Sequence, residues 1–284
     1  MTGAGPAPVQ PVPGPRLPTS PSGRQGDVLT RGGRARTHPP GCDPRPLRLF
    51  TFHHAGGSPS AFSGWRKRLA PETEVVPVSL PGRGRDGRSP RYHDMTSLVE
   101  ALAEDLGPDL EGPHAFYGHS MGALVAYRLT RLRAGSGQRL PARLMVGAFA
   151  APHLFHGFHH TRQPDDDELR DWLVAVSGRS TALAALIDDG DDLGDSILTR
   201  LREDLRLCAG AWEGDAPSPL ACPVDVFTGI DDPLVPVADA ARWSSYSSAG
   251  TTVYEIPGGH FFPRESKADF FRALRSALRP VCNC

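Results

Sequence analysis

Hydrophobic and polar positions alternate in two ways along the chain. Short apolar runs have the length of strands, and between them apolar residues recur every three or four positions, as on one face of a helix. The run Ala115–Tyr117, for example, is followed by Val125, Leu129 and Leu132 at helical spacing. Strands that alternate with helices are typical of a mostly parallel sheet with helices on both faces. The pattern therefore predicts an α/β fold.

The same pattern predicts where the elements lie. We expect strands at 47–52, 75–80, 142–150, 224–228 and 251–256, besides the strand that ends before Ser120. We expect helices at 60–69, 95–106, 237–246 and 267–278, besides a helix that begins just after Ser120.

The alternation stops between about 152 and 217. Helical patterns near 169–176, 181–187 and 197–208 follow one another there without a strand between them. Because open α/β sheets bind their ligands at the carboxyl ends of the strands, we expect this insertion to cover those ends as a helical lid.

The first part of the chain has a different composition. Residues 1–45 are rich in Pro, Gly, Ser and Arg and contain no aromatic residue. Such a segment cannot bury enough apolar surface to offset the entropy of ordering. We therefore expect a disordered tail at 1–45 and one domain at 46–284, with the lid at about 152–217.

The chemistry of the chain is expected at the turn between the strand and the helix on either side of Ser120. Gly118-His119-Ser120-Met121-Gly122 is a Gly-x-Ser-x-Gly motif. In a nucleophile elbow the serine adopts a strained conformation, and side chains two residues before and after it would collide. The two glycines remove those side chains, so Ser120 is the expected nucleophile.

The other members of a catalytic triad follow from chain order, which in this architecture is serine, acid, histidine. His260 is the only histidine beyond His160, and it follows Gly258-Gly259 at the end of a predicted strand. Between Ser120 and His260, only Asp231 and Asp232 come just after a strand. We choose Asp232, because Pro233 restricts the backbone directly after it.

Two backbone N–H groups are expected to form the oxyanion hole. The loop after the first strand supplies one of them in hydrolases of this plan, and Ala55 is the candidate there. Met121 supplies the other at the start of the helix, whose positive dipole end favours a developing negative charge. The expected reaction is acyl transfer to water, in which His260 takes the proton of Ser120 and Asp232 orients the imidazole.

Composition excludes several other classes. The formal net charge is −1, which gives no bulk attraction to nucleic acid or to anionic lipid. There is neither a membrane-spanning apolar run nor a secretory signal, so we expect a cytoplasmic protein with no membrane partner. We also expect a monomer with no nucleic-acid partner. The five cysteines are too scattered for a disulfide framework.

Two further motifs lack the context that their function needs. Gly82-x-Gly84-x-x-Gly87 matches a dinucleotide fingerprint, but Ser89-Pro90 follows where its helix should run. The sequence HLFHGFHH places His153 and three further histidines at spacings that suit a metal, but no carboxylate partner is implied. We therefore expect neither a cofactor nor a metal.

Five stretches carry a resemblance to a known family: FHHAGGS, LPGRG, GHSMGALVAY, GIDDPLVP and PGGHFF, which run from Phe52 to Phe262. The chain resembles the type II thioesterases that accompany polyketide synthases and non-ribosomal peptide synthetases. The resemblance implies an α/β-hydrolase fold with a helical lid, no cofactor, and the triad and oxyanion-hole residues named above. It also implies acyl groups held as thioesters on the phosphopantetheine arm of an acyl or peptidyl carrier protein, and a role in removing stalled or wrong acyl units.

Three other functions remain open at this point. The fold and triad also suit a general esterase that acts on free esters. A non-catalytic protein on the hydrolase fold is a second alternative, although the complete set of serine, acid and histidine speaks against it. A nicotinamide oxidoreductase is the third.

Overall fold

The protein is described by a computed structural model over residues 46–81, 92–154, 165–177, 192–209 and 218–282. The expected tail at 1–45, the glycine-rich loop at 82–87 and the helix at 181–187 lie outside these described residues.

Six parallel strands form one sheet in the order β2-β1-β3-β4-β5-β6. The strands are β1 (Leu47–Phe52), β2 (Thr73–Pro77), β3 (His114–His119), β4 (Leu144–Gly147), β5 (Val224–Gly229) and β6 (Thr251–Ile256). The residues of β3, β4 and β5 are all buried, as expected for parallel strands covered on both faces. The predicted parallel α/β sheet is thus confirmed.

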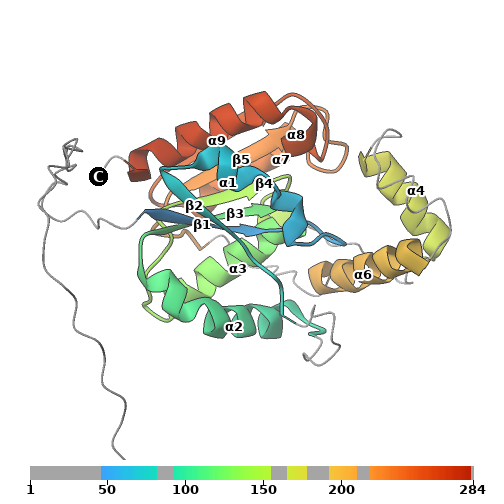
Figure 1. Ribbon diagram of the computed structural model, residues 1–284, viewed down its shortest axis with the longest axis horizontal. Coiled ribbons are helices and arrows are strands. Elements are labelled where there is room, and N and C mark those ends of the chain that lie inside the picture. Colours follow the sequence, from blue (N-terminus) through green and yellow to red (C-terminus); the bar gives the residue numbers. More distant parts are fainter. Residues whose placement is uncertain (1–45, 82–91, 155–164, 178–191, 210–217, 283–284) are drawn as a thin grey trace, which may run out of the picture. The chain divides into compact units, whose positions relative to one another are not determined.

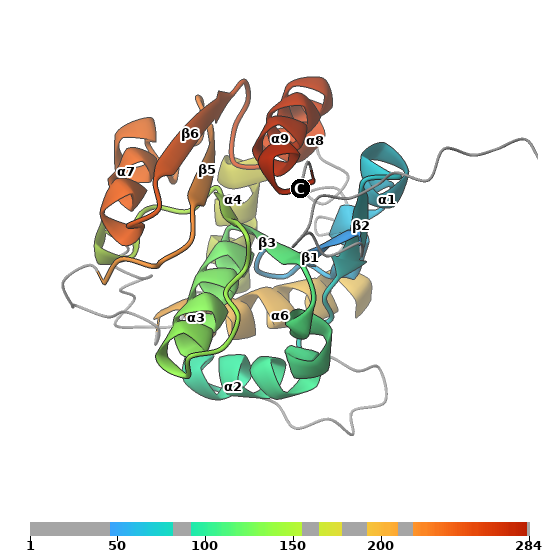
Figure 2. The same ribbon diagram turned by 90° about the vertical axis from the view of Figure 1, so that its left-hand side faces the viewer.

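Helices cover both faces of the sheet (Figure 1, Figure 2). One face carries α2 (Met95–Leu106), α3 (Met121–Gly135) and α7 (Val237–Ala241), and the other carries α1 (Trp65–Leu69), α8 (Phe262–Glu265) and α9 (Lys267–Cys282). Because side chains alternate along a strand, β3 contributes to both cores. Phe116 packs with the α2–α3 core, whereas Ala115 and Tyr117 pack with the α1–α9 core.

Several predicted elements differ in detail. The helix expected at 60–69 is divided into η1 (Pro59–Phe62) and α1, because Gly64 adopts a left-handed conformation with φ of 80°. The helix expected at 237–246 is α7 followed by the 3₁₀ turn η4 (Arg242–Tyr246). The strand expected at 142–150 is shorter, since Ala148 has a φ of 52° and leaves the extended conformation. The short helix α8 was not predicted.

Among the described residues between β4 and β5, where the lid was expected, two α-helices are found: α4 (Asp166–Ser177) and α6 (Asp192–Ala209). They share a small apolar cluster, made by Leu169, Leu173, Leu198, Leu201 and Leu205. A capping box begins α4, since the Asp165 side chain accepts from the Glu168 N–H and the Glu168 side chain accepts from the Asp165 N–H. None of the helices in the described part of the chain has the length and hydrophobicity needed to cross a membrane.

Candidate active site

Ser120 lies at a sharp turn between β3 and α3. Its φ of 54° and ψ of −121° are unusual for a residue with a side chain, and such strain is characteristic of functional sites. A Cβ atom on Gly118 would overlap the carbonyl of Gly122, and a Cβ on Gly122 would overlap the carbonyl of Phe52. Both glycines of the motif are therefore required for the turn to form.

Asp232 and His260 come together from the loops after β5 and β6. The His260 Nδ1–H donates to Asp232 Oδ2 at 2.8 Å, and both side chains are buried. The other oxygen of the same carboxylate, Oδ1, accepts from the Leu234 N–H at 2.9 Å, which fixes its orientation. The neighbouring Asp231 is exposed and uses its backbone N–H to bind the Gly258 carbonyl. Asp232, the aspartate chosen from the sequence, is thus the one that is paired with His260 in the structure.

The second ring nitrogen of His260 is available for proton transfer. Because Nδ1 carries the proton that binds Asp232, Nε2 presents its lone pair. This Nε2 is buried, and it has no hydrogen-bond partner among the described residues, Ser120 included. A bond from a serine hydroxyl to the histidine is often long in an unliganded enzyme and tightens when substrate binds.

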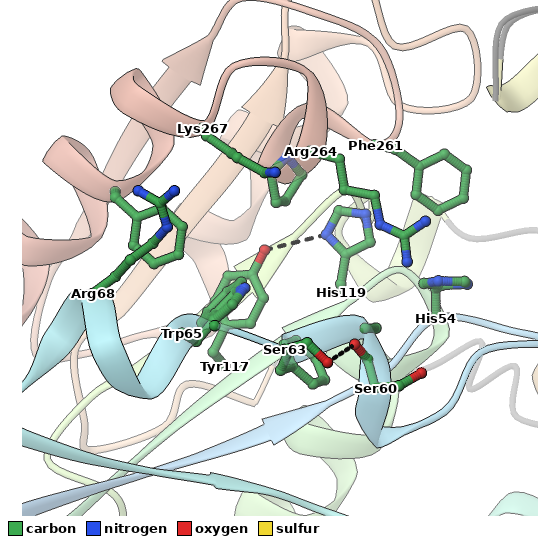
Figure 3. Close-up of a pocket in the computed structure, with 15 residues that line it drawn as sticks. His54, Ser60, Ser63, Trp65, Arg68, Tyr117, His119, Phe261, Arg264 and Lys267 are labelled. Atoms are coloured by element: carbon green, nitrogen blue, oxygen red, sulfur yellow. Dashed lines mark hydrogen bonds between the residues drawn. The ribbon is translucent and has the colours of Figure 1, made fainter. Parts of the chain in front are cut away.

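His119 connects the end of β3 with the loop that carries His260. The sequence interpretation missed this residue. Its Nε2–H donates to the backbone carbonyl of His260 at 2.9 Å, and its Nδ1 lies 3.2 Å from the Tyr117 hydroxyl, which donates to it (Figure 3). Complete burial lowers the pKa of His119 well below the usual range, so the ring stays neutral and keeps this tautomer. The alternation of β3 already placed Tyr117 and His119 on one face, but no pattern indicated their partner.

The two oxyanion-hole candidates belong to the start of α3 and to the loop after β1. Met121 is the first residue of α3, and the first N–H groups of a helix have no partner within it. Ala55 belongs to the loop after β1, which approaches the start of α3 closely, since a Cβ on Gly122 would meet the carbonyls of Phe52 and His53. This close approach brings the two loops that hold the candidates together.

A helix of the expected lid holds the loop that carries Ala55. The Gly56 N–H donates to Asp204 Oδ2 at 2.7 Å, and Asp204 is fully buried on α6. Beside Ala55 lies a cavity of about 280 Å³, whose apolar wall includes Leu173 and Leu201 from α4 and α6. No sequence signal indicated the contact between Gly56 and Asp204, because 148 residues separate them.

His54 is a second neutral histidine near His260, and it is half-buried. Its Nδ1–H donates to the Ala55 carbonyl at 2.9 Å, and its ring contacts that of Phe261 edge to face at 5.0 Å. Burial is the main cause that lowers its pKa from 6.5 to about 3. His54 and His119 therefore bring no positive charge to the surroundings of His260.

The described residues offer no metal site. Among them, no group of three or more His, Cys, Asp or Glu side chains could hold a metal ion. His153 stacks on Tyr246 with ring centroids 5.7 Å apart, and its Nδ1 lies 3.1 Å from the tyrosine hydroxyl. The other three histidines of HLFHGFHH lie outside the described residues.

The sheet order and the serine turn place the chain in the class of α/β-hydrolase folds, and comparison with known proteins narrows the class. The profile of the family described as "Thioesterase domain" matches residues 47–278. The chain belongs to the thioesterase family.

The chain is also similar to individual proteins. "Linear gramicidin dehydrogenase LgrE" of Brevibacillus parabrevis is 32% identical over 81% of this chain and 87% of its own length. The solved structure of RedJ, a thioesterase from the prodiginine biosynthetic pathway of Streptomyces coelicolor, is 35% identical and superposes with a TM-score of 0.69 over 84% of this chain and 91% of its own. The structure of BorB, a type II thioesterase from the borrelidin biosynthetic cluster, is 28% identical with a TM-score of 0.71 over 83% and 94%.

Proposed function

We propose that the protein is a serine thioesterase whose catalytic triad is Ser120, His260 and Asp232. The observation that carries the proposal is the buried bond from His260 Nδ1 to Asp232 Oδ2, beside a serine held at a φ of 54°. His260 Nε2 takes the proton as Ser120 Oγ attacks the thioester carbonyl, and then returns it to the departing thiol. Water, activated in the same way, releases the acyl group from Ser120.

The N–H groups of Ala55 and Met121 stabilise the tetrahedral oxyanion in this proposal. Both belong to backbone that is held in place before substrate arrives, Met121 by α3 and the loop of Ala55 by Asp204. Donors that need no reorganisation are the most effective in stabilising a transition state.

The proposed substrates are acyl groups on the phosphopantetheine arm of acyl or peptidyl carrier proteins. The names of RedJ and BorB connect those relatives with biosynthetic pathways, and BorB is called a type II thioesterase. By this proposal the protein removes stalled or wrong acyl units from an assembly line, acts as a cytoplasmic monomer and needs no cofactor. The segment at about 152–217, with α4 and α6, forms the lid of the domain at 46–284, and 1–45 is a tail outside it.

The test compares one acyl group on three carriers. Hydrolysis rates are measured for the acyl group on a carrier protein, on coenzyme A and on a small thiol. A carrier adds contacts remote from the thioester, and binding energy from such contacts positions the reacting group, so we expect the highest kcat/KM for the carrier. Equal rates for all three substrates would show that the protein is a thioesterase with no preference for a carrier protein.

Two controls separate the competing functions. A preference for oxygen esters over thioesters of the same acyl group would favour a general esterase. The name of LgrE includes "dehydrogenase", so the purified protein is also examined for bound nicotinamide and for NADPH oxidation. Reduction of a substrate by NADPH, without hydrolysis, would contradict the proposal.

A further inference from the structure

A second cavity lies on the α1–α9 side of the sheet, next to the loops of the candidate active site. Its volume is about 430 Å³, and Figure 3 shows its lining. Apolar walls come from Trp65 of α1, Phe271 of α9 and Phe261, the residue after His260. The cavity is therefore lined by the residue that follows the candidate catalytic histidine in the sequence.

Three cationic side chains line this cavity: Arg68 of α1, Arg264 of α8 and Lys267 of α9. No carboxylate from the described part of the chain lines it. None of the three cations takes part in an ion pair among the described residues. Although the formal net charge of the chain is only −1, three positive charges gather around this one cavity.

The acidic residue next to Arg264 in the sequence binds elsewhere. Glu265 follows Arg264, but its Oε2 accepts from the Gly259 N–H at 2.6 Å and does not line the cavity. Like charges that line one cavity repel one another. An anionic ligand bound between them relieves this repulsion, so the cavity favours an anion.

The cationic cavity lies next to the smaller cavity beside Ala55. The two share four lining residues: His54, Ser60, Ala61 and Arg264. A ligand that extends past these shared residues would have one end beside Ala55 and its other end among Arg68, Arg264 and Lys267.

We propose that Arg68, Arg264 and Lys267 form a subsite for the phosphate group of the phosphopantetheine arm. This inference rests on the proposed function, since it names where that substrate's charged end binds. A phosphate monoester or diester suits guanidinium and ammonium donors, which bind its oxygens through charge-assisted hydrogen bonds. The apolar walls accommodate the uncharged part of the arm.

The first experiment compares two substrates that differ only in the phosphate. Hydrolysis of acetyl-4′-phosphopantetheine and of acetyl-pantetheine is measured at low ionic strength. We expect kcat/KM to be about tenfold higher for the phosphorylated compound, because two or three exposed cations contact the phosphate. Equal hydrolysis of both would overturn the phosphate subsite and leave the thioesterase proposal intact.

The variants Arg264→Ala and Lys267→Ala test the residues. Each should lower kcat/KM for acetyl-4′-phosphopantetheine by about threefold to tenfold and lower kcat/KM for acetyl-pantetheine by a smaller factor. Lys67→Ala is the matched control, because Lys67 is exposed on α1 beside Arg68 but does not line the cavity. A phosphate preference that persists in both cavity variants, or disappears in the control, would contradict the assignment.

A second measurement tests binding at the subsite without turnover. Calorimetric titration with phosphopantetheine and with pantetheine should show tighter binding of the phosphorylated form, and this difference should vanish in the double variant Arg264→Ala, Lys267→Ala. If no thioester is hydrolysed but this difference is present, the proposed function fails and the anion subsite stands. If phosphopantetheine binds no better than pantetheine, the subsite is refuted.

Discussion

His260 Nδ1 and Asp232 Oδ2 are 2.8 Å apart, although the two residues belong to different loops. The loops are held side by side, because the Asp231 N–H donates to the Gly258 carbonyl at 3.0 Å and a Cβ on Gly229 would overlap the Gly259 carbonyl. The pairing of acid and histidine therefore depends on the close approach of the two backbones as much as on the side chains.

Asp232→Asn should lower kcat by about four orders of magnitude, because an amide does not select the tautomer in which Nε2 can accept a proton. Asp231→Asn should change kcat by less than about twofold, since Asp231 is exposed and contributes only its backbone. Steady-state kinetics on both variants is the measurement. Equal losses, or a larger loss for Asp231→Asn, would show that the acid is misassigned.

Ser120→Ala should remove four to six orders of magnitude of turnover, roughly the effect of losing a triad nucleophile. The fold should persist, because alanine retains the Cβ that the turn already contains. A fluorophosphonate probe should label the parent protein at Ser120 and leave the variant unlabelled. Labelling of Ser120→Ala would identify a different nucleophile.

His119→Phe should lower kcat by about tenfold with little change in KM. The phenyl ring cannot donate to the His260 carbonyl, so the backbone that carries the catalytic imidazole is less well positioned. Tyr117→Phe removes only the hydroxyl next to His119 Nδ1 and should have a smaller effect on kcat. If His119→Phe lowers the melting temperature and leaves kcat intact, its role is structural alone.

Asp204→Ala should lower kcat by about tenfold, because the Gly56 N–H loses its acceptor and the loop of Ala55 becomes less rigid. Thr199→Ala is the control, since Thr199 is exposed on the same helix. Hydrolysis of an activated small thioester by both variants is compared. A kcat for Asp204→Ala equal to that of the control would show that the contact from α6 to this loop does not support catalysis.

Stability should decrease on acidification because of His114. Burial lowers the pKa of this histidine from 6.5 to about 4, so between these values the unfolded chain binds a proton that the folded protein does not. The stabilising contribution is complete above pH 6.5 and is lost as the pH falls to about 4, and its upper limit is about 3 kcal/mol.

Urea unfolding between pH 4 and 7 measures this dependence. His114→Phe should flatten the curve of unfolding free energy against pH, whereas substitution of the exposed His93 by Gln should leave its slope unchanged. A slope in His114→Phe equal to that of the parent protein would rule out this origin.

Local sequence determined the strands, the helices and the serine turn. The turn at Ser120 needs small residues at Gly118 and Gly122 for steric reasons, so the motif, with a strand pattern before it and a helix pattern after it, identified the nucleophile candidate. Chain order then predicted Asp232 and His260, because the loops after successive parallel strands open at the same edge of the sheet. The thioesterase family, expected from five short stretches, is confirmed by the match over residues 47–278.

Contacts between distant segments were decided only by the tertiary structure. The bond from His119 to the His260 carbonyl spans 141 residues, and the bond from Gly56 to Asp204 spans 148. The cationic cavity likewise joins Arg68 with Arg264 and Lys267 from the other end of the chain. Periodicity reports which face of an element is buried, but it carries no information on which side chain lies opposite, because that depends on how the helices pack against the sheet.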